Sequence, residues 1–181
     1  MTEFVDAVRT YLELAAPSQL KRAPFTDLTA RVVRRDEMVP GAFLEIYRAV
    51  GWKWGWRDRL FWPAERLAAH LASADISVWE CVVGDDMAGF FELQRHDDGS
   101  VEIAYFGIVD AFMGRGIGKA LLSRAAEEAW ALGATRVWLH TCTFDSPRAL
   151  PNYVARGFRV VRTETYKHRV PDDLLPASGR H

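Results

Sequence analysis

The chain has 181 residues, of which 49% are hydrophobic, and this size and composition are typical of one soluble globular domain. Its 23 Lys and Arg and 24 Asp and Glu residues are interspersed, so the sequence predicts no basic surface for nucleic acid or an anionic membrane. Met1 to Ala16 lacks the basic start and unbroken apolar core of a signal peptide, and no apolar run is long enough to cross a bilayer. We therefore expect a cytoplasmic protein with no membrane or nucleic-acid partner.

The first segment is predicted to be a helix. Phe4, Val8, Tyr11 or Leu12, and Ala15 recur at helical spacing, and the helix would end before Pro17. We expect one domain over residues 1–170 with a helical extension over about residues 1–27, followed by a mobile polar tail over residues 171–181.

The remaining elements alternate between strand-like and helix-like patterns. Runs of apolar and β-branched residues predict strands over residues 28–35, 76–83, 87–95, 101–109, 136–144 and 158–170. Helical periodicity predicts helices over residues 41–50, 64–72 and 119–130, and a short helix before the last strand. This order predicts an α/β (α+β) protein, with a mixed sheet and helices on both faces.

The most informative stretch is VEIAYFGIVDAFMGRGIGKALL, residues 101–122, in which a strand runs through a glycine-rich turn into a helix. Gly114, Gly116 and Gly118 leave backbone amides unshielded at the helix start, where unpaired N–H groups and the helix dipole favour a phosphate. Arg115 and Lys119 add positive charge. The turn therefore predicts an anion site, although the glycines alone also fit an ordinary strand-to-helix turn.

Two kinds of phosphate loop do not match this spacing. A Walker A loop ending at Gly118 and Lys119 would require glycine at Met113 and serine or threonine at Ala120. A dinucleotide fingerprint that begins at Gly114 would require another glycine at Lys119.

The turn resembles the acyl-CoA loop of the GCN5-related N-acetyltransferases, in which Gln or Arg is followed by two residues, Gly, one residue, and Gly or Ala. Gly116 and Gly118 match this pattern. Met113 stands at the Gln/Arg position and lacks the side-chain donor, for which Arg115 is a candidate replacement.

A second motif is similar to the last characteristic element of the same family, a helix with Ala, then Tyr four residues later, closed by Gly-Phe. Ala149, Tyr153, Gly157 and Phe158 match it, while Ser146 stands where the family often has Asn. The two motifs span residues 101–158 in the family's order. The resemblance implies a GNAT-like, mostly antiparallel central sheet with helices on both faces and one splayed parallel strand pair.

The resemblance also implies that acetyl-CoA is the co-substrate, without a metal ion. A bulge at the permissive Gly107 would splay the strand, and an amide near Ile108 would stabilise the oxyanion. The residues expected to bind CoA are Gly107, Ile108, Val109, Met113, Gly114, Arg115, Gly116, Ile117, Gly118, Lys119, Ser146 and Tyr153.

Two residues are candidates for the proton transfers. Glu102 matches the position of the general base in the histone-acetylating branch of the family, and burial on its strand would raise its pKa. The alternative is a structural glutamate paired with Arg136 or Arg95. Tyr153 matches the tyrosine that protonates the CoA thiolate, a task that suits a side chain with a pKa of about 10. A core tyrosine that donates to a backbone carbonyl is the alternative.

The connection GWKWGWRDRLFW, residues 51–62, is unusually rich in aromatic residues. Either these residues pack helices onto the sheet, or they line an acceptor pocket with a charged rim. The pocket residues would be Trp52, Trp54, Trp56 and Asp58, with Arg57 and Arg59 at the rim. His140 either faces the acceptor as well or is a buried, hydrogen-bonded histidine.

These inferences predict an acetyl-CoA-dependent N-acetyltransferase that moves an acetyl group directly to a primary amine, with a small molecule as the favoured acceptor. Two alternatives stay open: a non-catalytic acyl-CoA-binding sensor or regulatory module, and an enzyme that acetylates a protein N-terminus or lysine. The sequence is compatible with a homodimer and does not fix the oligomeric state.

Overall fold

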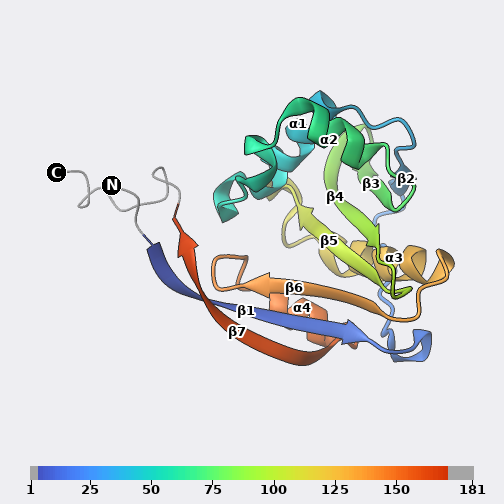
Figure 1. Ribbon diagram of the computed structural model, residues 1–181. Helices are drawn as coiled ribbons and strands as arrows, with labels where there is room; N and C mark the ends of the chain where they lie inside the picture. The colour runs from blue at the N-terminus through green and yellow to red at the C-terminus, as the bar shows by residue number, and fades with distance from the viewer. Residues whose placement is uncertain (1–3, 171–181) are drawn as a thin grey trace.

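Residues 4–170, which the computed structural model describes, form one seven-stranded sheet with helices on both faces (Figure 1). The strands are β1 (Phe4–Leu14), β2 (Ala30–Arg34), β3 (Ile76–Val83), β4 (Asp86–Arg95), β5 (Val101–Ile108), β6 (Val137–Cys142) and β7 (Arg159–Arg169). The helices are α1 (Pro40–Gly51), α2 (Ala64–Leu71), α3 (Ile117–Ala131) and α4 (Ala149–Ala155). Short 3₁₀ turns are η1 (Pro17–Gln19), η2 (Trp52–Trp54), η3 (Asp58–Phe61) and η4 (Asp110–Phe112). The predicted tail over residues 171–181 lies outside the described residues.

The sheet has the order β2-β3-β4-β5-β6-β1-β7, and its pairs are antiparallel except for β5 with β6. This parallel pair is in register only at Val101 with Val137 and Glu102 with Trp138. Beyond these residues the two strands diverge, as Figure 1 shows. The predicted mixed sheet with a splayed parallel pair is confirmed.

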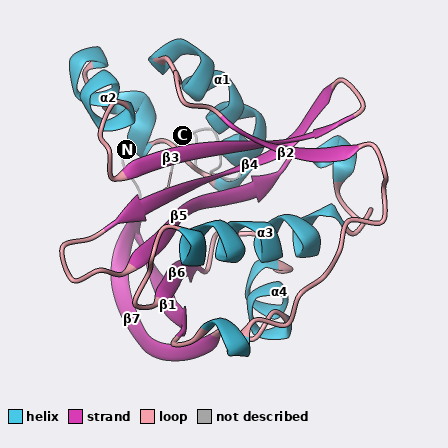
Figure 2. Ribbon diagram, turned by 90° about the vertical axis from the view of Figure 1, so that its right-hand side faces the viewer, coloured by secondary structure: helices cyan, strands magenta, loops and turns pink. Residues whose placement is uncertain are grey.

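Two hydrophobic clusters explain why the centre of the sheet is apolar on both faces. One cluster joins α1 and α2 to the sheet through Phe43, Tyr47 and Leu67, together with Phe90 of β4. The other joins α3 to the opposite face, where Leu121 and its neighbours are buried. Figure 2 shows α1 and α2 on one side of β3 and β4, with α3 on the other. Every residue of β3 is buried, as expected of a strand covered on both faces.

The prediction of an N-terminal helix is wrong, because Phe4–Leu14 is strand β1, hydrogen-bonded between β6 and β7. The register with β7 shifts between Tyr11 and Leu12. Such a bulge changes which side chains face the core, since alternation along a strand restarts after it. Ala7 is therefore buried on one side of the shift and Leu12 and Leu14 on the other, whereas Phe4 and Val8, whose spacing suggested a helix, are exposed.

The bulge predicted at Gly107 is also misplaced. The register of β5 with β4 shifts where Tyr105 and Ile103 pair with consecutive residues of β4, so Ala104 is the extra residue. Gly107 has a packing role instead, because a Cβ there would lie 2.2 Å from Val50 Cγ1 at the end of α1. Its missing side chain lets α1 approach β5 closely.

Within residues 4–170, no helix combines the length and the hydropathy that a membrane crossing requires.

Gly157→Ala is expected to destabilise the protein more than Gly133→Ala. Both glycines follow a helix end with left-handed backbone, at φ +98° and +83°, so each substitution costs about 1–2 kcal/mol in conformation. Only at Gly157 would the new Cβ also meet backbone, 2.0 Å from the Gln19 carbonyl oxygen. Urea unfolding should therefore show a further loss of about 1–3 kcal/mol in the free energy of unfolding for Gly157→Ala. Equal losses would contradict this role of the contact.

Candidate active site

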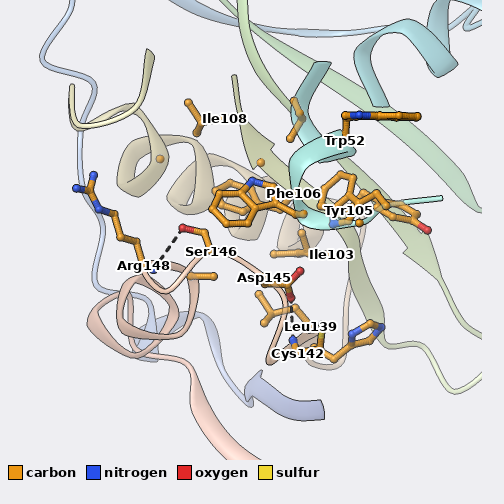
Figure 3. Close-up of a pocket in the computed structure, with 18 of the residues that line it drawn as sticks. Trp52, Ile103, Tyr105, Phe106, Ile108, Leu139, Cys142, Asp145, Ser146 and Arg148 are labelled. Carbon is orange, nitrogen blue, oxygen red and sulfur yellow. Dashed lines mark hydrogen bonds between the residues drawn. The ribbon is translucent and has the colours of Figure 1, made fainter. Parts of the chain in front are cut away.

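A cavity of about 1340 Å³ opens where β5 and β6 diverge. Ile103, Tyr105, Phe106 and Ile108 line it from β5, and residues at the end of β6 and in the loop to α4 line the other side (Figure 3). Because β5 pairs with β6 only at its first two residues, its edge toward the cavity has no strand partner from Ile103 onward within residues 4–170. Such an edge offers backbone N–H and C=O groups to an extended ligand.

The glycine-rich turn forms one end of this cavity. Gly114 and Gly116 have left-handed backbone, at φ +79° and +78°, and α3 begins directly after Gly116. The N-cap residue is Gly116, and among residues 4–170 no side-chain hydrogen bond caps the start of α3. Gly114, Gly116, Gly118 and Lys119 all line the cavity, so free amides, the positive helix end and an ammonium group meet there. This arrangement fits a phosphate or pyrophosphate.

The structure separates the predicted CoA-binding residues into two groups. Those that line the cavity are Gly107, Ile108, Met113, Gly114, Gly116, Gly118, Lys119, Ser146 and Tyr153. Val109, Arg115 and Ile117 are not among the lining residues. The Arg115 guanidinium donates to Asp27 at 3.1 Å and lies over the Phe112 ring, and Ile117 is buried in the core. The Arg115 guanidinium is therefore bound to Asp27 and Phe112, and it does not stand in for the side-chain donor that Met113 lacks.

Tyr153 reaches the cavity from α4 and is only 6% exposed. Its ring packs edge-on against Phe106 of β5, and Asn152 Nδ2 donates to the Gly118 carbonyl at 3.3 Å, which fixes α4 against the start of α3. Burial raises the pKa of Tyr153 well above its ordinary value, so the hydroxyl keeps its proton at neutral pH. In the loop before α4, Ser146 Oγ accepts a hydrogen bond from the Arg148 backbone N–H at 3.3 Å.

The aromatic connection forms another part of the wall, and it both packs and lines the cavity. Trp52, Trp54, Trp56 and Asp58 all lie on the lining. Trp56 also contacts Tyr105 edge-on, with ring centroids 5.0 Å apart. The two interpretations of this segment, packing and pocket wall, are thus not exclusive.

Asp58 is held in place by two tyrosine hydroxyls. Tyr105 donates to Oδ2 at 2.5 Å, and Tyr47 donates to Oδ1. Burial is the largest cause that raises the pKa of both tyrosines, which therefore stay protonated donors. A carboxylate is thus presented at an aromatic surface, an arrangement that suits a cationic amine.

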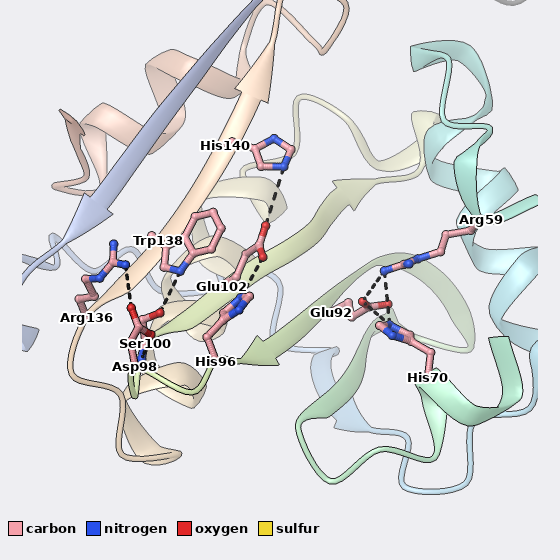
Figure 4. Close-up of polar contacts among 10 residues, drawn as sticks. All are labelled: Arg59, His70, Glu92, His96, Asp98, Ser100, Glu102, Arg136, Trp138 and His140. Carbon is pink, nitrogen blue, oxygen red and sulfur yellow. Dashed lines mark hydrogen bonds and ion pairs between the residues drawn. The ribbon is translucent and has the colours of Figure 1, made fainter. Parts of the chain in front are cut away.

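Arg59 does not lie at the cavity rim, where the sequence placed it, but is buried at 7% exposure. Its guanidinium donates to Glu92 Oε1 at 3.1 Å and stacks over Trp62, while His70 Nε2 lies 2.9 Å from the same oxygen. This cluster joins η3, α2 and β4 (Figure 4). Sequence patterns gave no sign of it, because its members come from three separated segments.

Glu102 is nearly buried, and its partners are histidines rather than the predicted arginines. Oε2 lies 3.1 Å from His96 Nε2, and Oε1 lies 3.8 Å from His140 Nε2 (Figure 4). Arg136 instead contacts Glu13 and Asp98. Burial raises the pKa of Glu102, as the sequence predicted, while the His96 contact opposes the shift. Within residues 4–170, no His, Cys, Asp and Glu side chains form a group of three that could hold a metal ion.

Glu102 itself does not line the cavity, whereas His140 does. His140 is therefore a partly exposed residue of the cavity wall. Its partial burial and the Arg9 guanidinium lower its pKa. His96 was not singled out in the sequence, because its contact with Glu102 depends on the turn between β4 and β5.

Comparison with known proteins agrees with this architecture. Residues 42–158 match the model of the Acetyltransferase (GNAT) family, and the chain belongs to that family. A mycothiol acetyltransferase from Corynebacterium efficiens is 32% identical over 149 residues. The match covers 79% of this chain but 45% of that protein, so the chain spans less than half the length of this curated relative.

Solved structures support the fold. A GCN5-related N-acetyltransferase from Kribbella flavida matches 94% of this chain and 60% of its own chain, with a TM-score of 0.65 and 16% identity. An aminoglycoside acetyltransferase from an uncultured soil metagenomic sample matches 72% of this chain and 88% of its own, with a TM-score of 0.60 and 16% identity.

Arg59→Met is expected to lower the free energy of unfolding by about 3–5 kcal/mol, because Glu92 would stay buried without its guanidinium partner. The double variant Arg59→Met/Glu92→Leu should recover much of this loss, since both buried charges are removed. Arg66→Met is the control, because exposed Arg66 also covers the Trp62 ring but should cost about 1 kcal/mol or less. Urea unfolding tests all three, and additive losses in the double variant would contradict the coupling.

Proposed function

We propose that this chain is an N-acetyltransferase that uses acetyl-CoA and acetylates a primary amine of a small molecule. The observation that carries the proposal is that one cavity is lined by two unlike groups of residues. One group is the glycine-rich turn and Tyr153, and the other is Asp58 and its aromatic neighbours. Membership of an acetyltransferase family supports the reaction class.

The donor side fits CoA. Amides at Gly114 to Lys119 would hold the pyrophosphate, and the open edge of β5 from Ile103 to Ile108 would pair with the extended arm. Bound acetyl-CoA supplies a thioester whose acyl carbon accepts an amine. Tyr153 carries its proton at neutral pH, burial raises its pKa further, and this proposal has it give that proton to the departing sulfur.

The acceptor side fits a cation. Asp58 attracts an ammonium group, and Trp54 and Trp56 offer ring faces or edges beside it. A wall of three tryptophans over η2 and the following turn suits a compact acceptor better than an extended peptide. The fold-level likeness to an aminoglycoside acetyltransferase is consistent with a small amine, and the relative named for mycothiol with another small acceptor.

Gly116→Val and Gly118→Val are each expected to abolish the rise in Tm that CoA produces. A side chain at Gly116 is strained by its left-handed backbone, and one at Gly118 enters the cavity lining beside Ile108. Thermal denaturation with and without CoA gives the measurement. Gly133→Ala, at the other end of α3, is the control and should keep the ligand-dependent shift. A full shift in both turn variants would place CoA elsewhere.

Tyr153→Phe is expected to lower turnover roughly 10²-fold or more while CoA affinity stays near the parent value. The change removes one oxygen and almost no packing area, and a donor to the departing thiolate acts mainly in the transition state. Free-thiol release with an amine that the parent acetylates measures turnover. A variant as fast as the parent would make Tyr153 a packing residue. A parent that binds CoA but acetylates no amine in a broad screen would favour a non-catalytic module.

A further inference from the structure

The side chains of His140, Glu102 and His96 form a series that starts at the cavity. His140 lines the cavity, and its side chain is 38% exposed. Glu102 comes next, at 3.8 Å from His140 Nε2 and 12% exposed. His96 closes the series behind Glu102 at 3.1 Å. Figure 4 shows the carboxylate between the two rings.

The order of these groups matters, because a proton leaving a ligand in the cavity meets His140 before Glu102. Glu102 is absent from the cavity lining, and its two oxygens face the two imidazoles. Both its burial and its partners therefore suit a group that acts through a neighbour. The Tyr11 ring packs edge-on against His140, with centroids 5.6 Å apart, and restricts its rotation.

We propose that His140 accepts the proton of the acceptor ammonium and that Glu102, held by His96, positions His140 and stabilises its charged form. This inference rests on the proposed function. Glu102 Oε1 lies 3.8 Å from Nε2, an ion-pair distance, so its charge stabilises the imidazolium, and Nδ1 is the proposed proton acceptor. The ammonium N–H bond breaks, its electron pair stays on nitrogen for attack on the acyl carbon, and the proton forms a bond to Nδ1. Water then removes the proton from the partly exposed imidazolium.

Charged groups of both signs on several elements surround His140. The groups that face it are Arg9 and Tyr11 of β1, Asp58 of η3, Glu102 of β5, Asp145 after β6 and Glu164 of β7. Burial, the largest cause, and Arg9 lower the pKa of His140, whereas the carboxylates of Asp145, Glu164 and Asp58 oppose the shift. A neutral imidazole at pH 7 follows, which is the form that accepts a proton.

The first test needs no ligand and measures the pKa of His140 by NMR in the free protein. The ring signal is assigned by its absence from the His140→Gln spectrum. In Glu102→Gln the imidazolium loses its neighbouring anion, so the pKa of His140 should fall by about one unit. The His168 signal is the control, because this ring stacks on Phe144 instead, and it should titrate as in the parent. An unchanged pKa of His140 would overturn the positioning role of Glu102.

The second test is the pH dependence of kcat/KM with an amine that the parent acetylates. His140→Gln should lower kcat/KM roughly 10²–10⁴-fold and remove the limb that rises as His140 loses its proton. Glu102→Gln should move that limb to lower pH by the shift that NMR measures. Because Glu102 acts through His140, the double variant should be no slower than His140→Gln. His140→Asn is the second replacement, and circular dichroism checks that each variant is folded.

Different outcomes separate this inference from the proposed function. A parent that acetylates an amine, with His140→Gln and His140→Asn retaining its rate and rising limb, would overturn the inference alone. A further large loss in the double variant would show that Glu102 acts independently of His140, and would also overturn it. A parent without turnover overturns the proposed function, and the role of His140 in it, whatever the NMR titration shows.

Discussion

The short pairing of β5 with β6 is the constraint on which the candidate site depends. The two strands share register at two residue pairs and then separate, yet each stays fixed by its other neighbour, β4 or β1. The separation therefore costs the hydrogen bonds of one strand edge without loosening either strand. Everything at the site follows from this opening: β5 leads into the glycine-rich turn, β6 leads into α4, and both present side chains to one cavity.

The aromatic wall of the cavity consists of residues that also pack the structure. Trp56 fills the space above Gly51, where a Cβ would come within 2.2 Å of its ring, and Gly107 lets Val50 approach β5. Asp58 is fixed by two tyrosines and by η3, which the buried Arg59 and Glu92 hold to β4. Arg59 Nε and Glu92 Oε2 lack hydrogen-bond partners among the described residues, so this anchoring carries a desolvation cost. The same anchoring helps to fix the position of the Asp58 carboxylate.

The sequence predicted those elements of the fold that depend on contacts between neighbouring residues. Patterns among neighbouring residues predicted the glycine-rich turn, α3 and the strands β3 and β4. The structure contains all of them close to the expected bounds. The strand β1 escaped prediction because its bulge at Tyr11 and Leu12 broke the alternation and because its partners, β6 and β7, lie far along the chain. The contacts of Glu102 with His140 and of Arg59 with Glu92 escaped prediction for the second reason, whereas the contact of Glu102 with the nearby His96 depends on the turn between β4 and β5. Side chains from separate segments leave no periodic trace in the sequence.

One physical cause can set both protonation states that the proposed reaction requires. Burial disfavours the charged form of every ionisable group, so it raises the pKa of Tyr153 and lowers that of His140. For tyrosine the neutral form carries a proton to give, and for histidine the neutral form has a lone pair to receive one. The same desolvation favours the neutral form of the proposed donor on α4 and of the proposed acceptor on β6, two elements that both reach one cavity. In the proposed reaction neither group needs a dedicated charged partner to begin in the required state, and Glu102 would stabilise the imidazolium that forms only after the proton has moved.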